Sequence, residues 1–161
     1  MNIYKSIATI AVILSLSLIL GITWLRTSLP RTSGTVFVTG ITKEMITGHS
    51  IDWGEVRSVL DVSDAIIAHN ASFDRHFLEK SIDFQNVWAC SKADINWKER
   101  GFLNTKLELL AIWHGFYYDS HRAMNDVNAT LHLLLHPSYD TYPPLEELVD
   151  NSQKSHHLIV N

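Results

Sequence analysis

Residues 65–74 read AIIAHNASFD, and this stretch decides the fold. Its first four residues form a continuous apolar run between polar neighbours, which is typical of a strand buried on both faces. The apolar residues that follow recur at helical spacing, at Phe73, Phe77 and Leu78. A buried strand leading directly into a helix predicts one unit of an α/β fold, with Asp74 at the start of its helix.

The chain on both sides of this stretch continues the alternation of helix and strand. Residues 87–90 (VWAC) predict a second short buried strand, and a helix with one apolar face is expected behind Asp52. Thr105 begins another predicted helix that ends near Gly115. Residues 123–135 (AMNDVNATLHLLL) carry the strongest helical pattern. We therefore expect an α/β layered fold.

A second polar stretch, residues 121–126 (HRAMND), complements the first. It puts the imidazole of His121 on a loop and the carboxylate of Asp126 in the first turn of the following helix. Asp74 holds the equivalent place in the earlier helix, so both carboxylates can converge on a crevice at one end of the sheet. Taken singly, each is also consistent with an ordinary acidic residue at a helix N-terminus, and His121 with an ordinary surface histidine.

Together, the two stretches resemble the second and third motifs of the DEDDh-type 3′–5′ exonucleases. This is the family of the proofreading (epsilon) subunit of bacterial DNA polymerase III. Its second motif, His-Asn-x-x-Phe-Asp, matches residues 69–74, and its third, His-x-Ala-x-x-Asp, matches residues 121–126. Residues 38–45 (VTGITKEM) look like the family's segment between the first and second motifs. The resemblance covers about residues 36–136.

The resemblance implies an RNase H-like fold in which four carboxylates hold two Mg²⁺ or Mn²⁺ ions that cleave phosphodiester bonds. It makes Asp74 and Asp126 metal ligands, and it makes His121 the general base that deprotonates the attacking water. It gives supporting roles around the substrate to His69, Asn70 and Phe73, with the phenyl ring packed beneath the site. The implied partner is a 3′ end of DNA or RNA, and a DNA polymerase subunit is a further possible partner.

The family's first motif, Asp-x-Glu, has no counterpart here, because residues 1–43 contain no Asp or Glu. The acidic residues next along the chain follow the Thr-Gly-Ile-Thr segment, on helices expected to pack away from the site. We therefore expect an N-terminally truncated domain with an incomplete sheet, weak metal binding and impaired or lost hydrolysis. The strand at 65–68 would then expose an unpaired edge, which favours aggregation or a partner.

Two alternatives follow from the missing motif. The chain is either a membrane-tethered, non-catalytic pseudo-nuclease that binds nucleic acid or a protein, or it receives the missing strand from a complementing chain. Four of the 13 basic residues but none of the 17 acidic residues lie in residues 1–43, so the rest of the chain has a formal net charge of −8. This negative charge argues against an extended surface for nucleic acid, which is usually basic. The single cysteine, Cys90, excludes an internal disulfide.

The ends of the chain differ from its body. Residues 6–25 carry no charge, and about 20 helical residues cross a bilayer core roughly 30 Å thick. We expect a transmembrane anchor within residues 1–26; a signal peptide or a foreign segment joined to the domain is the alternative. Flanking basic residues favour a single-pass protein of the cell membrane with its C-terminal domain in the cytoplasm. Residues 27–35 predict a linker, and residues 137–161 a loosely ordered polar tail.

Overall fold

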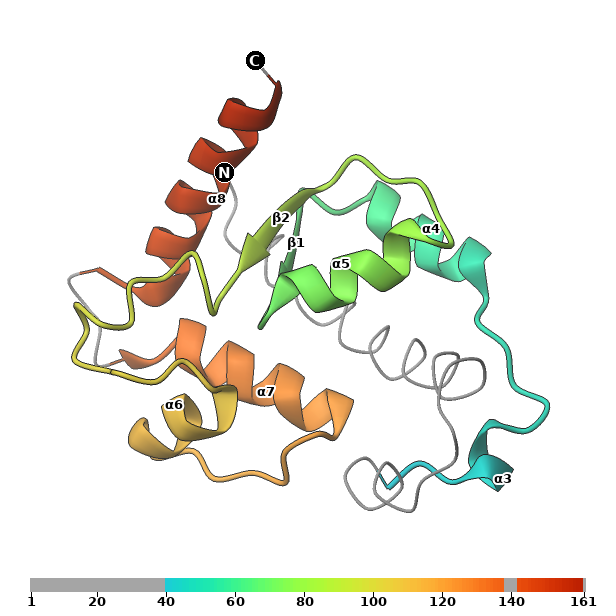
Figure 1. The fold of residues 1–161 in the computed structure, drawn as a ribbon, viewed down its shortest axis with the longest axis horizontal. Helices are drawn as coiled ribbons and strands as arrows, with labels where there is room; N and C mark the ends of the chain where they lie inside the picture. The colour runs from blue at the N-terminus through green and yellow to red at the C-terminus, as the bar shows by residue number, and fades with distance from the viewer. Residues whose placement is uncertain (1–39, 138–141, 161) are drawn as a thin grey trace.

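The structure, a computed structural model, describes residues 40–137 and 142–160 (Figure 1). It confirms a mixed α/β architecture. The order of elements is α3 (Lys43–Ile46), α4 (Trp53–Asp61), β1 (Ala65–Ala68), α5 (Ala71–Glu79), β2 (Val87–Cys90), α6 (Leu107–Trp113), α7 (Ala123–Leu134) and α8 (Pro144–Val160). The predicted anchor (6–25) and linker (27–35) lie outside the described residues. None of the helices in the described part combines the length and apolar character needed to cross a membrane.

The two predicted strands form a parallel pair. Ala65 lies opposite Val87, and the register continues to Ala68 opposite Cys90. Parallel neighbours need a crossover connection, which α5 provides. Side chains alternate across the sheet, so that Ile67 packs on one face and Ile66 on the other. Both are almost fully buried because helices cover both faces, as the continuous apolar run of β1 predicted.

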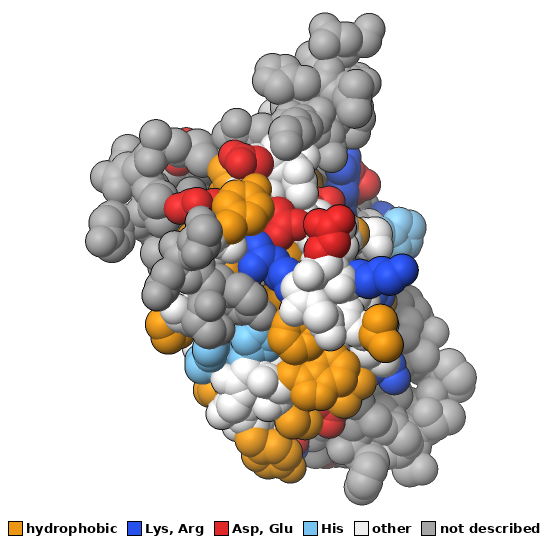
Figure 2. Space-filling model, turned by 90° about the vertical axis from the view of Figure 1, so that its left-hand side faces the viewer, with side chains coloured by type: hydrophobic (Ala, Val, Ile, Leu, Met, Phe, Trp, Pro, Cys, Tyr) orange, Lys and Arg blue, Asp and Glu red, His pale blue; other side chains and the backbone are white. Residues whose placement is uncertain are grey.

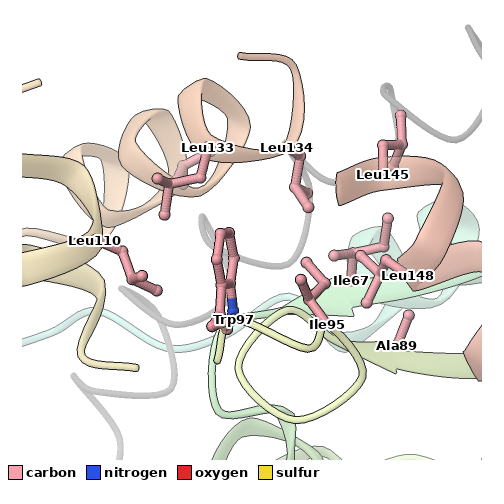
Figure 3. Packing of buried hydrophobic residues seen from close by; sticks show 10 residues of the cluster. Ile67, Ala89, Ile95, Trp97, Leu110, Leu133, Leu134, Leu145 and Leu148 are labelled. Carbon is pink, nitrogen blue, oxygen red and sulfur yellow. The ribbon is translucent and has the colours of Figure 1, made fainter. Parts of the chain in front are cut away.

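One face of the sheet meets what we call the Trp97 cluster. Trp97 is 1% exposed and stands at the centre of side chains from α6, α7, α8 and the strands (Figure 3). The indole Nε1 donates a hydrogen bond to the Ser91 carbonyl oxygen at 2.7 Å, so its one polar atom is satisfied inside the core. The cluster comprises Ile67, Ala89, Ile95, Trp97, Leu110, Val127, Leu133, Leu134, Leu145 and Leu148.

The opposite face meets a second core, the Ile66 cluster, which α4 and α5 provide. Helix α4 begins where the Asp52 side chain accepts hydrogen bonds from the backbone N–H groups of Gly54 and Glu55, at 2.9 and 3.1 Å. This N-cap satisfies donors that have no partner within the helix. The cluster comprises Ile51, Val56, Leu60, Ile66, Ala68, Ala71 and Leu78.

We expected a loosely ordered tail over residues 137–161, and this was wrong for Pro144–Val160. From Pro144 the chain forms α8, which packs against β2. Pro144 fits the first turn of a helix because its missing N–H has no partner to lose there. Leu145 and Leu148 then lie on one side, three residues apart, and are buried in the Trp97 cluster. The polar composition of the segment concealed this short apolar stripe.

Candidate functional site

A cavity of about 510 Å³ lies at the end of the sheet where β1 and β2 both run out. Its lining includes all of the side chains that the sequence selected, from two stretches nearly fifty residues apart. The carboxyl ends of parallel strands are where α/β folds form binding crevices. These residues are His69, Asn70, Phe73, Asp74, His121 and Asp126.

The first stretch reaches the cavity because β1 turns directly into α5. Asn70 makes this turn with a left-handed backbone (φ 70°), a conformation that asparagine tolerates better than most residues. Helix α5 begins at Ala71, so Asp74 falls in its first turn, at the wall of the cavity. The positive end of the helix dipole favours an ionised carboxylate at that place.

The His69 side chain connects three segments of the site through hydrogen bonds. Its Nε2 lies 2.9 Å from the Thr105 carbonyl oxygen and its Nδ1 lies 2.9 Å from the Ser91 hydroxyl. A carbonyl only accepts, so Nε2 carries the proton and Nδ1 accepts from Ser91. Burial lowers the pKa of His69 to about 4, against the opposing effect of the Thr105 hydrogen bond. The neutral ring therefore joins the ends of β1 and β2 to the segment before α6.

The resemblance implied that the Phe73 ring packs beneath the site, and the structure contradicts this. Its side chain is 56% exposed and lines the cavity wall. The ring meets Phe77 edge to face, with centroids 5.1 Å apart. Phe73 lies one helical turn before Phe77 in α5 and is not among the buried residues of that helix, Ala71 and Leu78.

The second stretch is organised around Asp126. His121 has a left-handed backbone (φ 64°), and its N–H points to Asp126 Oδ1 at 3.4 Å. The Tyr118 hydroxyl also donates a hydrogen bond to this carboxyl group. Burial raises the pKa of Asp126, and the hydrogen bonds from Tyr118 and His121 oppose that change. Asp126 therefore fixes the loop on which the exposed imidazole of His121 stands.

Contacts that the sequence did not reveal complete the surroundings. A Cβ built on Gly40 would lie 1.6 Å from Arg122 Nη1, so the guanidinium lies directly against the glycine backbone. Arg122 also forms an ion pair with Asp119 at 3.2 Å. Glycine at position 40 has φ +69°, which side chains rarely adopt. This contact places Gly40 against the loop that carries His121.

The two metal ions implied by the resemblance would need several carboxylates that converge in the cavity. Asp74 and Asp126 both line the cavity, together with Glu108. Within residues 40–137 and 142–160, however, no group of three or more His, Cys, Asp or Glu side chains is arranged to hold a metal ion. The described residues therefore do not fit a two-ion centre, which needs a larger set of carboxylates.

The cavity also contains cations that the sequence analysis overlooked. Lys92 follows β2, Lys106 precedes α6, and both line the cavity. Lys92 Nζ donates a hydrogen bond to the Asn70 side-chain oxygen at 3.2 Å. Lysines are common on protein surfaces, so only their convergence with the two motifs could have singled them out.

Comparisons with known proteins add no relative from which a role could be transferred. No protein-family model matches the chain, and no curated protein or solved structure shows significant similarity to it.

Proposed function

We propose that the cavity is the 3′-end site of a 3′–5′ exonuclease-type domain whose hydrolysis of phosphodiester bonds is impaired. The observation that carries this proposal is the convergence of two separated motifs. The stretches 69–74 and 121–126, which resemble two nuclease motifs, both contribute side chains to one cavity at the end of a parallel strand pair. If Asp74 and Asp126 were unrelated acidic residues at two helix N-termini, there would be no reason for both to line the same cavity.

The arrangement of elements supports an RNase H-like fold as part of this proposal. The two parallel strands are joined by the crossover helix α5, and helix α7 follows later in the chain. Each of these helices has one carboxylate in its first turn, Asp74 in α5 and Asp126 in α7. Both helix starts open on the same cavity. This is the geometry expected for acidic residues that act on one phosphate.

The chemistry available to the described residues is limited. His121 is exposed at the cavity, where its imidazole can act as a general base toward a water molecule. The Asp126 carboxylate holds the loop of His121 by accepting a hydrogen bond from the His121 backbone N–H. Divalent ions would supply charge stabilisation at the phosphate, but residues 1–43 contribute no carboxylate to hold them. The proposed site therefore recognises a 3′ end better than it cleaves one.

Metal titration tests the ligand roles. We expect calorimetry of the full chain with Mn²⁺ to give weak binding, with Kd on the order of 1 mM, as for loosely built carboxylate sites. Asp74→Asn and Asp126→Asn should each abolish it, because each removes a charge at nearly constant size. Asp64→Asn, which alters an exposed carboxylate away from the cavity, serves as the matched control. Binding that survives both cavity variants would remove the two aspartates from the proposal.

A hydrolysis assay tests the impairment and the complementing partner. A 5′-labelled oligonucleotide incubated with the full chain and Mn²⁺ should be shortened very slowly or remain intact. A peptide carrying an apolar strand with Asp-x-Glu should increase the rate, and His121→Ala or Asp126→Asn should prevent that increase. Rapid hydrolysis by the chain alone, unaffected by these variants, would contradict the proposal.

A non-catalytic, membrane-tethered binding module is the second candidate. The Asp126 carboxyl group favours this candidate, because it already accepts hydrogen bonds from Tyr118 and the His121 N–H, and because burial raises its pKa. Under this alternative the chain binds nucleic acid or a protein, but neither Mn²⁺ nor the complementing peptide produces hydrolysis. Attachment through residues 6–25 remains a prediction, and co-sedimentation of the chain with membranes after a high-salt wash tests it.

A further inference from the structure

Three histidine side chains meet outside the cavity, where α6 and α7 end. His114 follows α6, His132 lies in the last turn of α7, and His136 comes shortly after that helix. The His136 ring contacts both of the others, with centroids 5.0 Å from His114 and 5.1 Å from His132. Figure 2 shows histidine side chains close together on one face of the molecule, beside hydrophobic ones. We call these three rings the histidine cluster, and none of them lines the cavity.

The hydrogen bonds within the cluster suit neutral imidazoles. His114 Nδ1 lies 2.6 Å from the Leu110 carbonyl oxygen, and His132 Nε2 lies 3.3 Å from the His114 carbonyl oxygen. A carbonyl only accepts, so each of these nitrogens carries a proton, and one proton per ring is sufficient for both bonds. The neutral rings therefore join the end of α6 to α7.

A positive charge in the cluster has unfavourable surroundings. Burial is the largest effect on the pKa of His114 and lowers it, against the hydrogen bond to Leu110. The charges of His136, His132 and Arg100 lower the pKa further. Because the rings are in contact, a proton on one disfavours a proton on the next, and the cluster takes up protons as a group.

The other groups around His114 come from the loop before α6 and from α8. Phe102 lies 4.8 Å and Trp97 6.1 Å from the His114 ring, measured between centroids. Arg100 belongs to the same loop, and Glu147 of α8 forms an ion pair with it at 2.6 Å. Imidazoles are the side chains that change charge near neutral pH, so the charge of the cluster, rather than of these neighbours, depends on pH there.

The cluster also holds the loop that leads from α6 to α7. The Phe116 ring stacks on His132, with centroids 4.7 Å apart and an interplanar angle of 22°. Tyr118 in turn stacks on Phe116 at 5.9 Å and donates a hydrogen bond to Asp126. A series of ring contacts therefore connects the histidine cluster to the loop that carries His121.

We propose that the histidine cluster is a pH-sensitive switch: its neutral rings hold the loop of residues 115–122 against α7, and their protonation releases this loop. Charged rings with centroids 5.0 and 5.1 Å apart repel each other, and separation of the rings relieves the repulsion. When His132 moves, Phe116 loses its stacking partner and Tyr118 loses the support of Phe116. The loop is therefore ordered at neutral pH and released below about pH 6.

Hydrogen exchange of the full chain tests the switch at pH values on either side of the imidazole range, about pH 7.5 and about pH 5.5. The backbone N–H groups of Gly115, Phe116 and His121 donate hydrogen bonds, so their exchange reports on the loop. After correction for the intrinsic effect of pH, we expect their protection to fall by about tenfold at the lower pH. Helix α4, which packs in the Ile66 cluster, is the internal reference and should change less.

Substitutions of His136 test the cause, because this ring contacts both of the others. His136→Phe keeps an aromatic ring but removes the titratable nitrogens, and it should limit the loss of loop protection to about threefold or less. His136→Gln, which is smaller and polar, is the second variant and should act in the same direction. His76→Gln, which alters an exposed histidine of α5, is the matched control and should behave like the parent chain. Thermal melts at about pH 7.5 show whether each variant keeps its fold.

Three results would overturn the inference: equal protection of the loop at both pH values, a loss of the same size in α4, or the same loss in the parent chain and in both His136 variants. A loss confined to the loop and reduced in these variants would support it. The measurement contains neither metal nor nucleic acid, so its outcome does not depend on the proposed function.

Discussion

The two faces of the β1–β2 sheet are covered by cores of different construction. The Trp97 cluster joins residues from Ile67 to Leu148, and the Trp97 indole makes a hydrogen bond to the Ser91 carbonyl oxygen inside it. The Ile66 cluster joins residues from Ile51 to Leu78, close together in the chain, and its ion pairs lie outside it on helix surfaces. The cavity lies at the end of the sheet between them, so its geometry depends on both.

The polar groups show the difference most clearly. On the Trp97 side, Arg100 and Glu147 form an ion pair at 2.6 Å with both side chains only 11% exposed. On the Ile66 side, the indole Nε1 of Trp88 is buried and has no hydrogen-bond partner among the described residues. Long-range polar pairing thus fixes α8 on one face, whereas apolar packing of neighbouring segments suffices on the other.

Trp97→Ala should produce the largest loss of stability. Removing this central ring leaves a cavity among Leu110, Leu133 and Leu134 and should lower the free energy of unfolding by about 4 kcal/mol. Chemical denaturation of the full chain measures it. Trp97→Phe, which keeps most of the volume but loses the bond to Ser91, should cost clearly less. Equal losses would mean that the hydrogen bond, not the packing, governs this core.

Glu147→Ala should rank second, at about 3 kcal/mol, because it leaves the charge of Arg100 buried without its partner. The same carboxylate also accepts from the Asn96 N–H at 2.6 Å, so the loop before α6 loses an anchor as well. Glu146→Ala, one residue earlier and exposed, is the matched control and should change stability by less than about 1 kcal/mol. Similar losses in both variants would contradict a special role for the buried pair.

The predictability of the fold followed the same division. Both strands and the helices of the Ile66 side were readable, because their apolar residues are periodic and pack locally. Helix α8 was not, since its start has few apolar residues, Leu145, Leu148 and Val149, and most of their partners lie far back in the chain. The ion pair of Glu147 with Arg100 is likewise invisible without coordinates, as any two charges could pair.

The site was predictable where it depends on motifs and unpredictable where it depends on contacts between loops. Asp74, His121 and Asp126 were predicted from the resemblance to two family motifs, and all three line one cavity. Tyr118 precedes its motif without any signal, and its hydrogen bond to Asp126 follows from the path of a loop. The contact of Gly40 with Arg122 depends in the same way on two distant turns meeting.

The contribution of His69 to the free energy of unfolding depends on pH. Its pKa is about 4 in the folded chain and near 6.5 when unfolded, so the unfolded state takes up the proton first as the pH falls. The contribution is fully present above about pH 6.5 and is lost toward pH 4, amounting to about 2 kcal/mol between about pH 7 and pH 5. In His69→Gln, this part of the pH dependence of unfolding should disappear. A slope identical to that of the parent chain would show that His69 does not titrate in this way.

The smallest effect is expected from the ion pair of Arg75 and Glu79 on α5. Both side chains are 49% exposed, and water screens the 2.6 Å contact between Nε and Oε1. A double-mutant cycle to alanine should give a coupling of about 0.3–0.5 kcal/mol, reduced further by added salt. A coupling as large as the loss in Glu147→Ala would mean that surface charges also hold the Ile66 side together. The contrast between the two cores would then lie only in where their partners sit along the chain.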